Sequence, residues 1–215
     1  MPDIALVDPE TTLTLSPHLT ACTGIDALTH AIEAYVSTAS SPVVDVHALA
    51  AIRLLRENLE QAFADPTDLA AREQMLLGSL QAGLAFSNAS LGAVHAMAHS
   101  LGGFLDLPHG ACNALLLDHV IRFNVSTATE RYRKIGEMMG LDLKRASPHA
   151  CGNALSQVLA DLRKQMGIAD RMGSYGVRSA DIPELARHAA QDACLVTNPR
   201  HMSCEEIKVI YGEAM

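Results

Sequence analysis

The 215-residue sequence contains no tryptophan, and aromatic residues make up only 4% of it. Hydrophobic residues nevertheless account for 49%, with alanine and leucine abundant among them. Small aliphatic side chains favour packed helices over a β-sandwich, whose strands are enriched in aromatic and β-branched residues. The length is sufficient for one large domain with a substantial core, or for two small ones.

Basic charge is also scarce. The chain has 16 lysines and arginines against 24 aspartates and glutamates, a formal net charge of −8. A protein that binds nucleic acid is expected to present a basic face. We therefore expect no nucleic-acid partner.

The sequence lacks closely paired cysteines and a secretion signal. Its five cysteines are scattered, and none forms a C-x-x-C pair. An odd, dispersed set is typical of free thiols in a reducing compartment rather than of a disulfide framework or a zinc ribbon. The opening MPDIALVDPE has no basic region followed by a long apolar one, so no signal peptide is predicted. These features favour a cytoplasmic protein.

One apolar window, residues 84–105, is long enough to cross a bilayer. Serine, asparagine and histidine interrupt it, and no lysine or arginine lies at its ends. Membrane helices usually carry such flanking basic residues. The window therefore indicates a buried helical segment, and no membrane association is expected.

The most informative stretch is LGAVHAMAHSLGGFLDLPHG, residues 91–110. His95 and His99 are four residues apart, so on a helix they lie on one face. The glycines at 102 and 103 are predicted to loosen or break this helix, and Pro108 marks a turn that can bring His109 back toward the pair. Imidazoles in an apolar segment need partners for their nitrogens. Backbone carbonyls can serve, but three histidines together favour a metal ion.

A second cluster lies upstream in GIDALTHAIEAY, residues 24–35. Asp26 and His30 again share a helix face at a spacing of four. Alone, this pair has an ordinary interpretation as a helix-stabilising contact of a few tenths of a kcal/mol, roughly. Combined with the downstream histidines, it predicts a four-ligand metal site composed of Asp26, His30, His95 and His109.

Three imidazoles and a carboxylate suit Fe(II), Zn(II), Co(II) or Ni(II) better than calcium, magnesium or Cu(I). A closed structural zinc site is an alternative, although such sites are usually rich in cysteine. A metal with more than four partners would leave room for water or substrate and act as a Lewis acid. His99 is surplus to the ligand set. It is interpreted equally well as a proton relay or substrate contact and as a packing residue.

The remaining sequence predicts an all-α, multi-helix bundle occupying residues 1–215 as a single domain, with about eight or nine helices. Ser16-Pro17 and Ser41-Pro42 indicate helix starts, as do Asp181 and Ser203. Residues 87–90 (SNAS) are predicted to be a short connection. Residues 4–7 are predicted to form a short strand, for which no partner strand is evident nearby.

Together, GIDALTHAIEAY and HAMAHSLGGFLDLPHG resemble the two signatures of the iron-containing (group III) alcohol dehydrogenases. The resemblance runs from Pro2 to Asn198. It implies the helical C-terminal domain of that family, which has a dehydroquinate synthase-like fold. Ser100 stands where many relatives have proline, a departure that touches no ligand.

The resemblance also implies roles for individual residues. Asp26, His30, His95 and His109 would bind Fe(II) or Zn(II). His99 would lie beside the nicotinamide of NAD or NADP, while Phe86 and Cys194 would line the substrate pocket. The implied reaction is reversible hydride transfer between a primary alcohol or aldehyde and NAD(P).

Members of this family carry an N-terminal nucleotide-binding domain, and no glycine-rich phosphate loop is found in this sequence. Two hypotheses follow: the catalytic domain of an iron-dependent alcohol dehydrogenase, and a stand-alone, non-catalytic metal-binding or assembly module derived from one. Little dehydrogenase activity is expected from this chain alone. Apolar surface that the missing domain would cover also favours a homo-oligomer.

Overall fold

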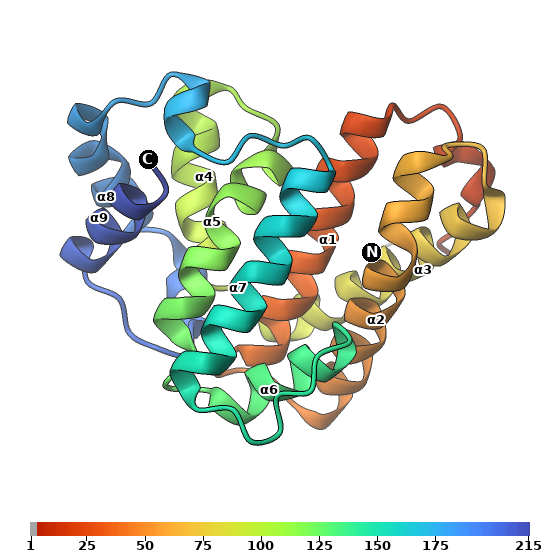
Figure 1. The fold of residues 1–215 in the computed structure, drawn as a ribbon, viewed down its shortest axis with the longest axis horizontal. Helices are drawn as coiled ribbons and strands as arrows, with labels where there is room; N and C mark the ends of the chain where they lie inside the picture. The colour runs from red at the N-terminus through yellow and green to blue at the C-terminus, as the bar shows by residue number, and fades with distance from the viewer. Residues whose placement is uncertain (1–3) are drawn as a thin grey trace.

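The computed structural model describes residues 4–215, and these residues form nine α-helices and four short 3-10 helices without any β-strand (Figure 1). The prediction of an all-α fold is confirmed. No helix in this described part is long and apolar enough to cross a membrane.

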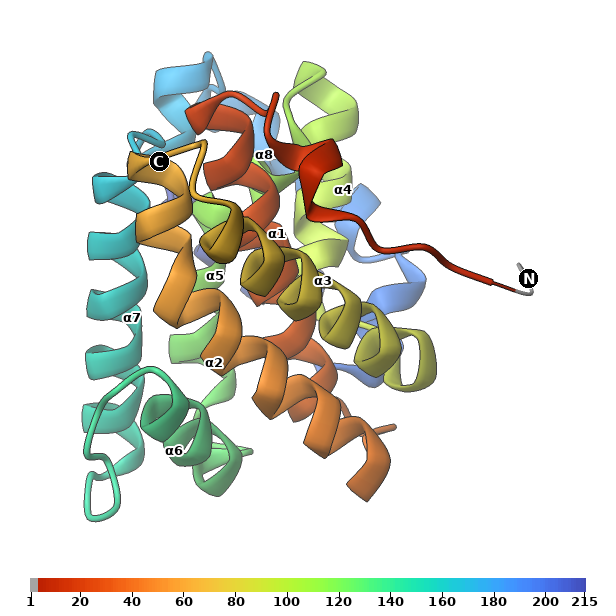
Figure 2. The ribbon, with the colours of Figure 1, turned by 90° about the vertical axis from the view of Figure 1, so that its right-hand side faces the viewer.

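The central helix is α1, Pro17–Val36, which is buried along most of its length. Figure 1 shows it between two groups of helices, and Figure 2, seen from the side of α2 and α3, shows it behind α3. On one side lie α2, Pro42–Ala64, and α3, Leu69–Ala89, which pack against each other and against α1. On the other side lie α4, Ala93–Leu105, and α5, His109–Asn124.

Four further α-helices and four 3-10 helices complete the described fold. The remaining α-helices are α6 (Thr129–Met138), α7 (Pro148–Gln165), α8 (Ile182–Ala189) and α9 (Cys204–Glu213). The 3-10 helices are η1 (Pro9–Thr12), η2 (Met172–Tyr175), η3 (Ser179–Asp181) and η4 (Ala193–Thr197). Helix α8 packs on α4 and on α9, and η4 also contacts α4, so C-terminal segments cover part of α4.

The four predicted helix starts are confirmed. Ser16 and Ser41 each accept a hydrogen bond from a backbone N–H of the first turn, with proline at the first helical position. Ser203 and Glu206 form the predicted capping box of α9. Helix α8 also begins directly after Asp181, but the predicted side-chain cap is absent, because this carboxylate accepts from the N–H of Arg178 in the preceding turn.

Two local predictions were wrong, and one alternative of a third is excluded. Residues 4–7 form no strand, and Ile4 and Leu6 are largely exposed because no strand in the described residues is available to pair with them. The SNAS connection is instead the last turn of α3, where the Asn88 side chain donates to the carbonyl of Leu84.

The glycines at 102 and 103 do not break α4, which continues to Leu105. A glycine costs a helix only about 1 kcal/mol relative to alanine, less than the packing of the buried α4 face provides.

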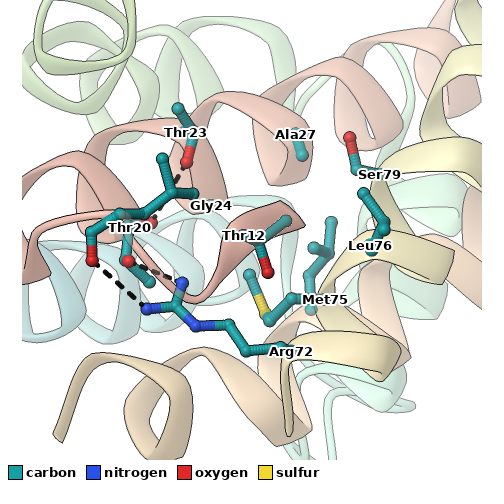
Figure 3. Close-up of a pocket in the computed structure, with 11 residues that line it drawn as sticks. Thr12, Thr20, Thr23, Gly24, Ala27, Arg72, Met75, Leu76 and Ser79 are labelled. Atoms are coloured by element: carbon teal, nitrogen blue, oxygen red, sulfur yellow. Dashed lines mark hydrogen bonds between the residues drawn. The ribbon is translucent and has the colours of Figure 1, made fainter. Parts of the chain in front are cut away.

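Arg72 on α3 ties the chain entering the bundle to its central helix (Figure 3). Its guanidinium is buried and donates to Thr20 Oγ1 at 2.7 Å, to the carbonyl of Pro66 at 3.1 Å and to that of Leu15 at 3.5 Å. The same side chain lines a cavity of about 220 Å³ whose walls are largely apolar, with Met75 among them. Arg72 thus connects three segments that no backbone ladder joins.

Replacing Arg72 by methionine is expected to lower the free energy of unfolding by about 2–4 kcal/mol, because three oxygen atoms lose a charged donor. The measurement is urea denaturation of the metal-free chain followed by circular dichroism. Arg53→Met, at an exposed position of α2, is the matched control and should change the midpoint little. Equal midpoints for the two variants would show that Arg72 does not clamp these segments.

Candidate metal centre

The four residues predicted to be metal ligands come together in the structure. Asp26 and His30 lie one turn apart on α1, His95 lies in α4, and His109 is the first residue of α5. One donor atom from each side chain lies within 4.8 Å of every other. Asp26 Oδ1 is 3.6 Å from Nε2 of both His95 and His109, and 3.9 Å from Nε2 of His30.

Close packing of α5 on α1 creates this convergence. Gly110 follows His109 directly, and a Cβ atom built on it would lie 2.5 Å from the carbonyl carbon of Cys22 and nearer still to its oxygen. Only glycine allows the first turn of α5 to approach the α1 backbone so closely. The contact sets the position of His109 relative to Asp26, which is one turn along α1 from Cys22.

Two polar residues at the site were missed in the sequence. Glu33 Oε2 lies 2.6 Å from His95 Nδ1, and Asn113 Nδ2 lies 3.1 Å from His109 Nε2. Both carried a usable signal. Glu33 follows Asp26 by seven residues and Asn113 follows His109 by four, so each shares a helix face with a predicted ligand.

The protonation states within the cluster diverge. Burial and the charge of His95 lower the pKa of His30 to about 4. Burial also disfavours the charged form of His95, but hydrogen bonding to Asp26 and to Glu33 outweighs it and raises the pKa to about 9. Burial lowers the pKa of His109. Burial raises that of Asp26, but the hydrogen bond from His95 and the nearby imidazoles bring it below its usual value. Asp26 is therefore ionised at neutral pH.

The hydrogen bonding of Asn113 tests whether a cation fits this cluster. Its amide nitrogen donates to Asp26 Oδ1 at 2.6 Å and lies 3.2 Å from His95 Nε2, in addition to its contact with His109. Asn113 Oδ1 is buried and has no hydrogen-bond partner in the described part of the chain. Three imidazole nitrogens, one carboxylate oxygen and an amide with an unpartnered oxygen therefore lie together, and three imidazoles with one carboxylate form a donor set that fits a divalent transition-metal ion.

His99 lies next to the cluster, not within it. Its ring stacks on that of His109 with the centroids 5.2 Å apart, and its side chain is 45% exposed. Its Nδ1 is 2.8 Å from Asp192 Oδ2, while Oδ1 of the same carboxylate accepts from the N–H of Cys194. Asp192, another residue missed in the sequence, thus orients His99.

The two residues expected to contact substrate each lie near a histidine of this region. Phe86 stacks on His30 with the ring centroids 4.6 Å apart. The Cys194 sulfur lies within 4.8 Å of a ring nitrogen of His99 and of a carboxylate oxygen of Asp192. Burial and the neighbouring Asp192 raise the pKa of the Cys194 thiol to about 12, so it is uncharged at neutral pH. An apolar ring thus lies against one candidate ligand, His30, and a neutral thiol lies near His99.

Comparison with known proteins identifies the family to which this chain belongs. Residues 20–215 match the sequence profile described as "Fe-containing alcohol dehydrogenase family, C-terminal". The 1,3-propanediol dehydrogenase of Citrobacter freundii is 44% identical over 214 residues, which cover 100% of this chain and 55% of that protein. The chain thus spans about half the length of the curated relatives it matches.

Solved structures agree. A crystal structure of 1,3-propanediol oxidoreductase superposes with a TM-score of 0.93 at 43% identity, covering 97% of this chain and 55% of that one. The sulfoacetaldehyde reductase of Bifidobacterium kashiwanohense, solved in complex with NAD+, gives a TM-score of 0.90 at 28% identity, covering 100% of this chain and 55% of that one. The chain belongs to the iron-containing alcohol dehydrogenase family and corresponds to its C-terminal helical region.

Proposed function

We propose that Asp26, His30, His95 and His109 bind one divalent transition-metal ion, Fe(II) in the native protein and Zn(II) as a substitute. We propose further that this region supplies the alcohol-activating half of an NAD(P)-dependent alcohol dehydrogenase. The observation that carries both statements is the convergence of three imidazole nitrogens and one carboxylate oxygen within 4.8 Å of one another. The family membership supports the choice of iron.

A cation at this position would supply Lewis acidity to the oxygen of an alcohol or aldehyde. Asp26 contributes the negative charge of the donor set, and the buried His95 keeps one side of it dry. His99 is placed to exchange a proton with substrate or solvent. Asp192 holds its Nδ1 and leaves Nε2 for that exchange. Phe86 and Cys194 would contact the carbon chain of a small substrate.

Hydride transfer also needs a nicotinamide cofactor. Because the relatives are nearly twice as long as this chain, we propose that a nucleotide-binding region outside residues 1–215 supplies most contacts to NAD(P). The NAD+ complex of the sulfoacetaldehyde reductase supports NAD as the cofactor class. The five free cysteines support a reducing compartment, and we propose the cytoplasm.

The deciding experiment is metal analysis of the chain purified without oxygen. We expect about one iron or zinc ion per chain, and near zero for Asp26→Asn, which removes the only charged donor. His99→Ala is the matched control, since it removes an imidazole beside the cluster and should leave the metal content unchanged. A wild-type chain that binds no added Fe(II) or Zn(II) would refute the proposal.

Metal binding should depend on pH with a defined sign. At pH 7 the metal-free His95, with its pKa raised to about 9, carries a proton that a cation must displace. His30 and His109, whose pKa values are lowered, are already neutral. The apparent affinity should therefore rise about tenfold per pH unit between pH 7 and 9, with release of about one proton per ion. Titration with Zn(II) in two buffers of different ionisation enthalpy measures that proton. A pH-independent affinity would contradict the expected charge of His95.

A further inference from the structure

Glu33 is a buried carboxylate in a segment where neighbouring side chains are apolar. It is 4% exposed and lies on α1, one turn beyond His30. A buried charge is costly unless it is hydrogen-bonded or paired. Its partners therefore indicate why it is there.

The first turn of α4 provides most of these partners. Glu33 Oε1 accepts from the N–H of Val94 at 2.7 Å, and Oε2 accepts from the N–H of Gly92 at 3.0 Å. The amides at the start of a helix have no partner within it, and the helix dipole favours an anion there. The fit is close, because a Cβ on Gly92 would lie 2.8 Å from Oε1.

The same carboxylate also holds a side chain of the metal centre. Oε2 lies 2.6 Å from His95 Nδ1, and both side chains are almost completely buried. A carboxylate can only accept, so Nδ1 must carry the hydrogen. In a neutral ring the lone pair then resides on Nε2, the nitrogen 3.6 Å from Asp26 Oδ1. In the described residues, neither His30 nor His109 has a carboxylate on its Nδ1.

We propose that Glu33 is a positioning residue of the metal centre: its carboxylate fixes the tautomer and orientation of His95 and increases the basicity of Nε2 toward a cation. The inference rests on the proposed metal-binding function. A carboxylate behind a ligating histidine has this effect in metal sites generally, and its loss typically lowers metal affinity about 10–100-fold. Glu33 would thus join α1 to the start of α4 and also orient a ligand of the metal ion.

A purely structural role is the competing explanation, since Glu33 also anchors the start of α4. Asn198 separates the two roles. It is buried, and its Oδ1 accepts from the N–H of Ala93 in the same turn, at 3.2 Å, without a hydrogen bond to His95. A variant at Asn198 therefore loosens the same helix start and leaves the histidine partner intact.

The test compares the wild-type chain with Glu33→Gln and Asn198→Ala. Glutamine keeps the shape and one acceptor oxygen but removes the charge. Affinity is measured by Co(II) titration, with the visible absorption of bound Co(II) reporting its coordination, and circular dichroism confirms the fold. We expect about 10–100-fold weaker Co(II) binding and an altered Co(II) spectrum for Glu33→Gln, and nearly wild-type values for Asn198→Ala.

Equal affinities for the wild type and Glu33→Gln would overturn the inference, as would an equal loss in both variants. If Glu33→Gln does not fold, Glu33→Asp replaces it: the shorter side chain keeps the charge near α4 but withdraws from Nδ1. Its affinity should also fall, and an unchanged value would overturn the inference. Failure of the wild-type chain itself to bind Co(II) would refute the proposed function and this inference with it, and the wild-type titration alone identifies that case.

Discussion

Replacing His95 by alanine is expected to abolish stoichiometric metal binding. His95 is the only one of the four candidate ligands on α4, and it is 1% exposed, so no other side chain or solvent can take its place. Its ring also contacts two carboxylates, Asp26 and Glu33. The variant loses one of four ligands and also the imidazole that faces these two carboxylates. Metal binding should therefore weaken by about three orders of magnitude or more.

The measurement is iron and zinc content per chain after anaerobic purification, followed by titration with Zn(II) in competition with a chelator. The metal-free variant should also be less stable, because the buried Glu33 carboxylate would lose the hydrogen bond from the imidazole. His201→Ala, an exposed histidine outside the cluster, is the control and should retain the wild-type metal content. If His95→Ala still held one tightly bound ion, the donors would have to be other residues.

Gly110→Ala should have the largest effect on stability, about 4 kcal/mol or more, because the added methyl group would overlap the Cys22 carbonyl. The obstacle is backbone in a central helix and not the end of a flexible side chain, so relief requires α5 to move away from α1. That movement would carry His109 away from Asp26. Any protein that still folds should therefore also bind metal more weakly.

Thermal unfolding of the metal-free chain measures this effect, and Gly103→Ala is a matched control. Gly103 lies in α4, with nothing within 4 Å of a built Cβ atom. Alanine there should stabilise the helix by up to about 1 kcal/mol. A Gly110→Ala chain as stable as the wild type would mean that the close contact between α1 and α5 is not required.

The sequence was sufficient for features encoded at short range. Serine followed by proline predicts the starts of α1 and α2, since both the cap and the fixed proline angle act within one turn. The spacing of Asp26 from His30 places them on one helix face, as the structure shows. The family resemblance carried the prediction further, to a helical fold that the structure and the comparisons confirm.

Other features depended on contacts that no local pattern specifies. Residues 4–7 have the composition of a strand, yet a strand needs a neighbour, and the described chain offers none. Glu33 shares a helix face with Asp26, but its partners come from the first turn of α4, which lies far along the chain. Asn113 likewise acquires a role only where α5 meets α1 and α4.

The sequence by itself determined which helices form, which side chains share a helix face, and the chemical types of donor available. Only the tertiary structure decided that donors from three helices converge, that a carboxylate lies behind His95, and that Gly110 permits the approach. The reason is physical. Helix formation and capping depend on interactions within a few residues, whereas a metal site depends on how separate helices pack, and that is set by side chains distant in sequence.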